Sequence, residues 1–457
     1  MVKVQNQSGP ISTNKFYANF FLGNQNQGVW THPYSLTWSK GGGNLRSWGM
    51  AVAHIDKTQR AFGPANPRIP GSPVQYFINP IGIQSIIFSA VEMSTSTVLS
   101  TRSLQAFSVN AILSPQLDST SSITFPCLQG MGFVTALYNR LMPVIQSAVF
   151  FRSLVQNSSP RLGLYKFTAI LEDGKVWLLY VRPTDGQDPR LQLVSNTQIQ
   201  GVRNWTGVIQ VAKNPSGSTG SAIYDSSAGV YPTRASVNGS ISEVTGTYQL
   251  SWTKAGFVQG QSLLVFAFPH HTQSFDSVTS KRQTSLQLQT TTKGLATAVL
   301  SDSWTLIEPT LPTAISFAPW SALTGTRTTL STSAKNIIEQ VAKAELSQNL
   351  ESQTNLDSLY FSGKALSKFA VMIYSTRVLL QQPILTSQAL GRLKTAFAKF
   401  VKNKQIYPLF YDAKWGGLVS TGALKTGDAN QDFGNTYYND HHFHFGKSRL
   451  VNRICIH

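Results

Sequence analysis

Residues 435–446 read NTYYNDHHFHFG, which places one carboxylate, three histidines and four aromatic residues within twelve positions. Such groups can move protons, bind metal or stack on a ligand. If the stretch is extended, Asp440, His442 and His444 share one face, because side chains alternate along a strand. A carboxylic acid among aromatic rings is partly desolvated, which raises its pKa and keeps it in the protonated form that a general acid requires. The stretch therefore predicts a site centred on Asp440.

Two other interpretations of this stretch remain open. Asp440, His442 and His444 form a possible ligand set for zinc or iron, although no second cluster of His, Cys, Asp or Glu stands out to complete the shell. Alternatively, the three histidines and the aspartate form a hydrogen-bonded corner with a purely structural role. Two nearby acids, Asp428 and Asp432, flank turn glycines, and helix capping or an Asx turn is the plain structural explanation for each of them.

The chain upstream of this stretch, from about residue 346, has a helical hydrophobic period. Pro383 separates two stripes of apolar residues, so each stripe predicts its own helix. The apolar positions are Leu366, Phe369, Ala370 and Ile373 in the first stripe, and Leu390, Leu393, Phe397, Phe400 and Val401 in the second. About 110 residues provide only three or four helices of ordinary length, so we expect the helical part to be incomplete.

From about residue 10 to 270 the pattern instead predicts many short strands, rich in β-branched and aromatic residues. Examples are Val74–Ile78, Ser85–Phe88, Val176–Val181 and Ser262–Phe268, with turn sequences at 172–174, 185–186 and 238–239. A mixed stretch follows, with strand-like segments at 296–300 and 304–307, a Ser/Thr-rich stretch at 326–333 and the start of a helix at 334–344. We predict a large antiparallel β-sandwich (1–271), a small mixed α/β connector (272–345) and a helical domain (346–457).

The composition limits the partners. The net charge is +18, from 38 Lys and Arg against 20 Asp and Glu, but the basic residues are scattered, so we do not expect nucleic-acid binding. No stretch is long and apolar enough to span a membrane, and no secretory signal is visible. Two cysteines, Cys127 and Cys455, are too few for a disulfide framework. As written, the sequence predicts a cytoplasmic monomer without cofactor or metal, or an extracellular, cell-wall-associated protein if its N-terminus extends further.

Five motifs give the chain a resemblance to glycoside hydrolase family 81, the endo-β-1,3-glucanases. They span nearly the whole chain up to Gly446, in an unchanged order. The motifs are PISTNKFYANFFLGNQNQGVWTHPYSLTW (10–38), FAFPHH (266–271), NLDSLYFSGK (355–364), YPLFYDAKWGGLVS (407–420) and GDANQDFGNTYYNDHHFHFG (427–446).

The resemblance implies an N-terminal β-sandwich, a small α/β connector and a C-terminal (α/α)6 barrel, with β-1,3-glucan as the substrate. Family members hydrolyse internal linkages with inversion. The aspartate of the NDHHFH motif is the family's general acid, and it corresponds to Asp440. Residues that the resemblance implies as binding or supporting groups are Asp428, Tyr438, His442 and His444, and Trp415 adds a flat ring suited to a sugar.

The chain departs from the family pattern after Gly446. The family continues with an aromatic residue and, further downstream, a barrel helix with the glutamate that is the general base, whereas here Lys447 is followed by SRLVNRICIH without any acid. This tail shows no evident helical stripe. We therefore expect a truncated family member that lacks its general base and hydrolyses little glucan. The alternatives are a non-catalytic β-1,3-glucan-binding fragment and a metal-dependent hydrolase.

Overall fold

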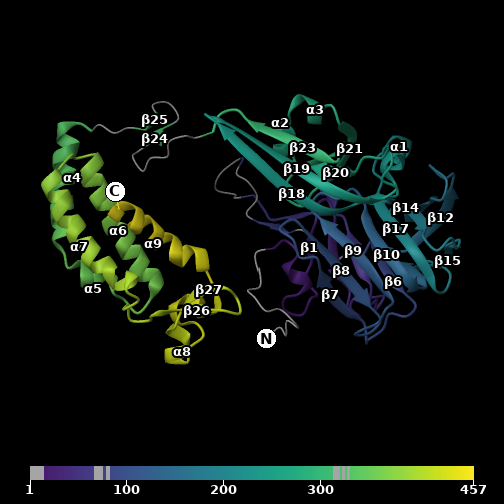
Figure 1. Cartoon of the computed structure of the whole chain (residues 1–457), viewed down its shortest axis with the longest axis horizontal. Coiled ribbons are helices and arrows are strands. Elements are labelled where there is room, and N and C mark those ends of the chain that lie inside the picture. Colours follow the sequence, from purple (N-terminus) through teal and green to yellow (C-terminus); the bar gives the residue numbers. More distant parts are fainter. Residues whose placement is uncertain are drawn as a thin grey trace. The chain divides into compact units, whose positions relative to one another are not determined.

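The computed structural model describes residues 15–65, 71, 76–78, 83–311, 320–321, 325–326 and 330–456. These residues fall into two compact units (Figure 1). We call them the β unit, whose described residues end at Leu311, and the helical unit, whose described residues begin at Trp320. Parts of the first motif (10–14), of the predicted strand Val74–Ile78 and of the Ser/Thr-rich stretch lie outside the described residues.

Two large antiparallel sheets dominate the β unit. The strands of the first sheet are, in spatial order, β1 (Val29–Trp30), β2 (Ser35–Trp38), β3 (Met50–Ala53), β6 (Ile86–Ala90), β11 (Pro143–Gln146), β16 (Gln198–Gln200) and β15 (Gln192–Ser195). Those of the second are β12 (Phe151–Asn157), β13 (Tyr165–Leu171), β14 (Val176–Pro183), β17 (Trp205–Lys213), β10 (Val134–Leu141), β9 (Ser122–Leu128), β8 (Ser108–Ser114) and β7 (Val98–Arg102).

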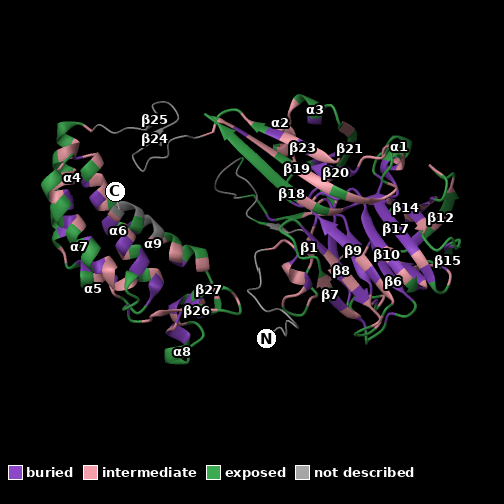
Figure 2. Ribbon diagram, in the orientation of Figure 1, coloured by how far each residue is buried: buried purple, intermediate pink, exposed green. Residues whose placement is uncertain are grey.

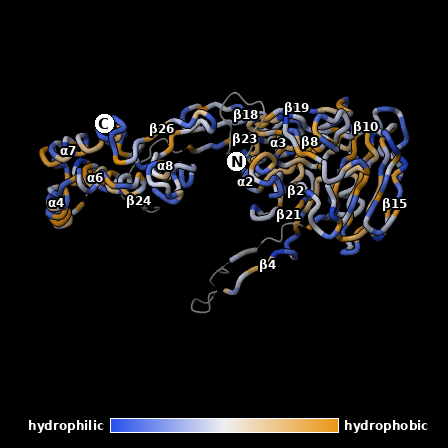
Figure 3. Tube along the Cα trace, turned by 90° about the horizontal axis from the view of Figure 1, so that it is seen from below, coloured by the Kyte–Doolittle hydropathy of each residue, from blue (hydrophilic) through white to orange (hydrophobic). Residues whose placement is uncertain are grey.

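The two sheets pack face to face. Phe88 on β6 and Phe125 on β9 meet edge to face, with ring centres 5.7 Å apart. The hydroxyl of Tyr138 on β10 donates a 3.0 Å hydrogen bond to the carbonyl of Ser89 on β6. The strands that carry these contacts, β6, β9 and β10, are buried along most of their length (Figure 2). In Figure 3, hydrophobic and hydrophilic positions are interspersed along the tube of the β unit. The predicted large antiparallel β-rich region is therefore confirmed.

Smaller elements complete the β unit. Two three-stranded sheets consist of β18 (Val230–Ser242), β19 (Thr245–Gly256) and β23 (Ser303–Glu308), and of β20 (Leu264–Ala267), β22 (Leu295–Leu300) and β21 (Gln283–Gln289). The remaining elements are β4 (Ala61–Phe62), β5 (Phe77–Ile78), α1 (Gly217–Ser227), α2 (Pro269–Ser274), α3 (Ser277–Ser280), and the short helices η1 (Ala18–Phe20) and η2 (Lys57–Gln59). Strands β22 and β23 thus pair with β20 and β19, which precede residue 270, and β21 pairs with β22.

Most strand predictions are confirmed, but the turn predicted at Asn238–Gly239 is wrong. Gly239 lies inside β18 and pairs with Tyr248. An Asn-Gly hairpin turn needs positive φ at both residues, and neither Asn238 nor Gly239 has it. The chain reverses instead after Ser242, where Glu243 takes the positive φ of 51°. Continuous pairing along both long strands outweighs the local turn preference.

The helical unit is built around α6. Its elements are α4 (Thr332–Ser347), α5 (Leu350–Thr354), α6 (Leu359–Val378), α7 (Pro383–Val401), β26 (Leu409–Asp412), β27 (Gly417–Ser420), α8 (Gly422–Thr426), η3 (Gln431–Tyr437) and α9 (His441–Ile456), with the short pair β24 (Trp320–Ser321) and β25 (Gly325–Thr326) before them. The predicted stripe on α6 is buried throughout. Pro383 separates α6 from α7, as predicted, and it lies in the first turn of α7. Among the described helices none combines the length and apolar character needed to cross a membrane.

Helix α9 corrects the expectation for the C-terminal tail. The tail after Gly446 was expected to lack a helical stripe, yet α9 continues to Ile456, and Val451 is fully buried in the helical core with Cys455 partly buried beside it. Lys447, Val451 and Cys455 recur every four residues and so share one face of the helix. The stripe includes a lysine, which is why its apolar pattern was not evident.

Candidate active site

The segment between α8 and α9 holds three of the six predicted site residues, Asp428, Tyr438 and Asp440, and its backbone is unusual. Asp432, Phe433, Tyr438 and Asp440 all have positive φ values, between 48° and 67°. Non-glycine residues adopt this conformation at a cost of about 1–3 kcal/mol each, and they keep it only where the surroundings enforce it. The contacts that fix this segment therefore define the site.

One set of contacts ties the segment to β27 and α8. The side chain of Asn435 accepts a 2.9 Å hydrogen bond from the backbone N–H of Ser420. The hydroxyl of Thr436 donates to the Ser420 carbonyl at 2.6 Å and accepts from the N–H of Ala423 at 3.1 Å. Asn435 and Thr436 are both buried, so these bonds are shielded from competing water.

Asp432 ties the same segment to α6. Its Oδ1 accepts hydrogen bonds from the Ser358 hydroxyl, at 2.8 Å, and from the Tyr360 N–H, at 3.3 Å. Ser358 is the N-cap of α6, so Asp432 completes the cap of that helix. The capping interpretation of Asp432 thus agrees with the structure, although the capped helix is distant in sequence.

Asp440 immediately precedes α9 and is exposed, so the partial desolvation expected for this carboxyl group among aromatic rings is wrong. Its carbonyl accepts a 3.0 Å hydrogen bond from the N–H of His444, which is the first helical bond of α9. The extended arrangement expected for Asp440, His442 and His444 is therefore wrong. Helical periodicity places Asp440 and His444 on one side and directs His442 elsewhere.

The three histidines have different surroundings. His444 is fully buried, with Nδ1 3.8 Å from Asp432 Oδ1. Burial lowers the His444 pKa, and the carboxylates of Asp432 and Asp440 oppose that shift. His441 stacks on the Tyr438 ring at 5.2 Å, and burial lowers its pKa too, with help from the neighbouring imidazoles. His442 is exposed.

Trp415 and Tyr438 are joined through the β26–β27 hairpin. Trp415 lies in the hairpin turn. Its backbone N–H and that of Lys414 donate hydrogen bonds to Asp412 Oδ1, at 3.2 and 2.9 Å. The Tyr438 ring packs against Gly417 at the start of β27: a Cβ at Gly417 would lie 2.6 Å from this ring. Burial raises the Tyr438 pKa, and the Asp412 carboxylate adds to that shift. Tyr438, in the segment that leads to Asp440, therefore contacts the hairpin whose turn holds Trp415.

Asp428 forms an Asx turn. Its Oδ1 accepts a 2.9 Å bond from the N–H of Asn430, and its own N–H donates to the Thr426 hydroxyl at 3.2 Å. The carboxylate is exposed. Asp428 thus fits its plain structural explanation, and its exposed oxygens stay available to a ligand.

Sequence reasoning missed two groups. Tyr411 on β26 has 60% of its side chain exposed and lies close enough to Tyr438 to affect its pKa. In the β unit, the FAFPHH motif gathers rings: Phe268 lies 5.3 Å from His32 and 5.4 Å from His271. Tyr411 and Phe268 lie in the motifs at 407–420 and 266–271. The aromatic content of these motifs is the sequence feature that could have indicated both groups.

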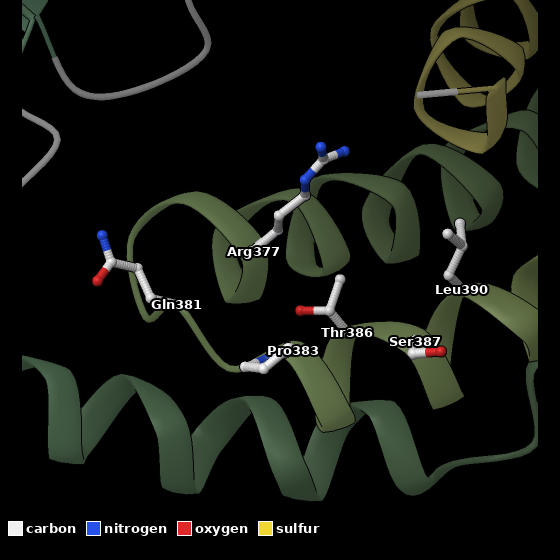
Figure 4. A pocket seen from close by; sticks show the side chains of 6 residues that line it. All are labelled: Arg377, Gln381, Pro383, Thr386, Ser387 and Leu390. Atoms are coloured by element: carbon white, nitrogen blue, oxygen red, sulfur yellow. The ribbon is translucent and has the colours of Figure 1, made fainter.

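Neither a metal group nor the cavity at the junction of α6 and α7 coincides with these residues. Among the described residues, no three His, Cys, Asp or Glu side chains gather in a metal-binding arrangement. A cavity of about 500 Å³ lies where α6 ends and α7 begins, lined by residues that include Arg377, Thr386 and Leu390 (Figure 4). Roughly 25 Å of helix separates Arg377 from Tyr360, at about 1.5 Å per residue. The candidate site therefore lies at the other end of α6, where Asp432 binds Ser358 and Tyr360.

Comparison with known proteins gives a consistent result over both units. Residues 1–322 match the model of the glycosyl hydrolase family 81 N-terminal domain, and residues 329–450 match that of the family 81 C-terminal domain. A glucan endo-1,3-beta-D-glucosidase of Arthroderma benhamiae is 52% identical over 97% of this chain and 49% of its own length.

Two yeast proteins are more distant. Glucan endo-1,3-beta-D-glucosidase 2 of Saccharomyces cerevisiae is 34% identical over 95% of this chain and 54% of its own. The primary septum glucan endo-1,3-beta-D-glucosidase of Schizosaccharomyces pombe is 34% identical over 97% of this chain and 42% of its own. The chain thus spans about half the length of the curated relatives it matches.

The fold is also similar to that of a solved structure. It is a mutant of a glycoside hydrolase family 81 protein from Clostridium thermocellum, with a TM-score of 0.67 and 15% identity, and the match covers 99% of this chain and 56% of that one. At this identity the likeness concerns the fold alone.

Proposed function

The chain belongs to glycosyl hydrolase family 81, and from this membership we propose that it is by descent an endo-1,3-β-glucanase. Its substrate is the β-1,3-glucan of cell walls or storage polysaccharide, whose internal bonds are cleaved with inversion. The helical unit corresponds to the first helices of an (α/α)6 barrel. The protein acts as a monomer and needs neither metal nor cofactor. The proposal also includes the domain boundaries at residues 271 and 345.

The observation that supports the proposal best is the position of Asp440. Asp440 is exposed, it follows a segment that is fixed on both sides, and it lies at the start of a helix, two residues from Tyr438 and from His442 in the sequence. In an inverting glycosidase one protonated carboxyl group donates to the leaving oxygen. We assign that role to Asp440.

The other residues bind or support. Trp415 and Tyr438 offer ring faces to sugars, and the exposed groups of Asp428 and His442 offer hydrogen bonds to hydroxyls. His444 has no exposed surface, so we assign it a supporting role behind Asp440.

The second carboxylate is the weak point of catalysis by residues 1–457. An inverting mechanism needs a base that activates water about 6.5–9.5 Å from the acid. No Asp or Glu follows Asp440 in residues 441–457, and Asp432 is buried within a helix cap. We therefore propose that this 457-residue polypeptide binds glucan with little turnover, and a non-catalytic glucan-binding protein is the second candidate function.

The experiment is a reducing-sugar assay on laminarin with the purified chain, combined with laminarin affinity electrophoresis. Turnover that Asp440→Asn lowers by at least about 100-fold supports the glucanase, because a general acid contributes 10²–10⁴-fold. Laminarin binding without turnover supports the binding protein. A chain that neither binds nor hydrolyses laminarin overturns both candidate functions.

Two further measurements complete the test. The anomeric form of the first product, followed by NMR, must be inverted. Turnover that a chelator removes identifies a metal-dependent hydrolase instead and contradicts the proposal.

A further inference from the structure

Asp432 is a buried carboxylate whose hydrogen-bond partners lie far from its own turn in the sequence. Its side chain lies among left-handed residues, and only 4% of the residue is exposed. Burial of a carboxylate costs several kcal/mol unless partners compensate for the lost water. The partners of Asp432 therefore indicate what this residue does.

Those partners join two helices at a single oxygen atom. Asp432 Oδ1 accepts from Ser358 Oγ and from the Tyr360 N–H at the start of α6, where the helix dipole favours a negative charge. The same Oδ1 lies 3.8 Å from Nδ1 of His444 in the first turn of α9, a contact that is an ion pair when His444 is protonated. Asp432 thus occupies the junction of α6, η3 and α9.

His444 connects this junction to Asp440. The His444 N–H binds the carbonyl of Asp440 at 3.0 Å, so any shift of the first turn of α9 also shifts Asp440. Close packing supports the connection: a Cβ at Gly363 on α6 would lie 3.7 Å from the His444 carbonyl and 3.2 Å from the side chain of Lys447.

The charges around His444 come from three sides. Asp432 faces it from η3 and Asp440 from the preceding turn, and both favour its protonated form. Lys447, one turn further along α9, and His441 disfavour that form. Lys364 on α6 acts in turn on Lys447.

We propose that Asp432 is a positioning residue, whose buried carboxylate locks the first turn of α9 onto the start of α6 and so fixes the direction of Asp440. The inference rests on the proposed role of Asp440 as the acid. Asp432 itself does not touch substrate, because it is buried and its bound oxygen is committed to the helix cap. Its contribution acts through His444.

The test uses the full chain and Asp432→Asn, which keeps an oxygen for the two α6 donors but loses the charge. The matched control is Asp357→Asn, which removes an exposed carboxylate just before the same helix N-terminus. Ser358→Ala is a milder second variant, since the Tyr360 N–H still binds Asp432.

Two readouts do not depend on activity. Hydrogen exchange should accelerate at least ten-fold in the peptide that covers the first turn of α9, and stay unchanged in α7. The His444 pKa, followed by NMR of ¹³C-labelled imidazoles, should fall by about one unit, since an opposite charge at 4–6 Å shifts a pKa by one or more units. Ser358→Ala should accelerate exchange at the same peptide, and Asp357→Asn should match the wild type in both readouts.

Turnover separates this inference from the proposed function. If the wild type hydrolyses laminarin, Asp432→Asn should lower kcat at least ten-fold with little change in KM. If the wild type has no turnover, the two structural readouts still decide the inference. Unchanged exchange and an unchanged His444 pKa in a folded Asp432→Asn protein overturn it, as does lost turnover with wild-type exchange.

Discussion

The ammonium group of Lys447 lies 3.8 Å from the centre of the Tyr360 ring and 3.9 Å from that of Phe443. A cation over two ring faces gains about 0.5–2 kcal/mol at each, depending on how far it is desolvated. Burial also lowers the Lys447 pKa. This contact fastens α9 to the start of α6, where Asp432 binds Ser358 and Tyr360.

Lys447→Ala should therefore destabilise the helical unit by about 1–2 kcal/mol, through loss of the cation and of its packed stem. The transition of that unit in differential scanning calorimetry measures the effect. Lys402→Ala, at an exposed position after α7, serves as the control and should change stability by less than about 0.5 kcal/mol. Equal effects of the two substitutions would show that the rings contribute nothing.

Two helical glycines should respond differently to alanine. A Cβ at Gly391 on α7 meets no atom within 4 Å, so Gly391→Ala should stabilise the unit by about 0.5–1 kcal/mol through helix propensity. A Cβ at Gly363 would lie 3.3 Å from the Lys447 Cβ, so crowding should cancel that gain. Urea unfolding of the two variants compares them directly, and a Gly363→Ala protein as stable as Gly391→Ala would refute the close packing of α6 and α9.

The helices were predictable because their determinants are local. The stripe from Leu366 to Ile373 needs only the 3.6-residue period, and Pro383 interrupts the pattern where α6 and α7 separate. The β-rich region was predictable for the same reason. The Asn238–Gly239 turn was not, because pairing with a partner strand decided the backbone there.

The candidate site was only partly predictable. Asp440 was found from its motif, but the arrangement around it depends on contacts over long separations. The partners of Asp432 lie 74 and 72 residues away, and no local pattern indicates them. His442 and His444 were assigned to one face because the stretch was taken as extended, whereas the helix separates them and buries only His444.

Gly417 provides a test of Tyr438 as a binding residue. A Cβ there would lie 2.6 Å from the Tyr438 ring, so Gly417→Ala must displace that ring. If Tyr438 contacts glucan, laminarin binding should weaken about five-fold, which corresponds to ~1 kcal/mol. Gly391→Ala, in open space on α7, should bind as the wild type does. Wild-type affinity in a folded Gly417→Ala protein would remove Tyr438 from the binding surface.

The β unit should lose stability in mild acid because of His54. This imidazole is buried, with Nδ1 2.9 Å from Lys213 Nζ and 3.5 Å from Asp56 Oδ1. Burial, helped by the Lys213 charge, lowers the His54 pKa from 6.5 to about 3. Between these two values the unfolded chain binds a proton that the folded chain does not, so stability falls as the pH decreases from 6.5.

The slope of this dependence identifies its source. One such proton corresponds to about 1.4 kcal/mol per pH unit. Burial opposes ionisation of Asp56, but Lys213 outweighs this effect and lowers the pKa of the carboxyl group. Asp56 therefore adds stability that is lost only when the pH falls below 3.8, the ordinary pKa of this group. Calorimetry between pH 4 and 6.5 therefore separates the imidazole from the carboxylate, although His271, whose pKa burial lowers to about 4, contributes in the same direction.

His54→Asn should make the stability of the β unit depend less steeply on pH in this range, by about one proton. Val52→Ala on the neighbouring strand β3 is the matched control, because it removes buried volume without removing a titrating group. It should lower the melting temperature of the β unit by a similar amount at every pH and keep the wild-type slope. A His54→Asn protein with the wild-type slope would show that His54 is protonated to the same extent in the folded and unfolded chains.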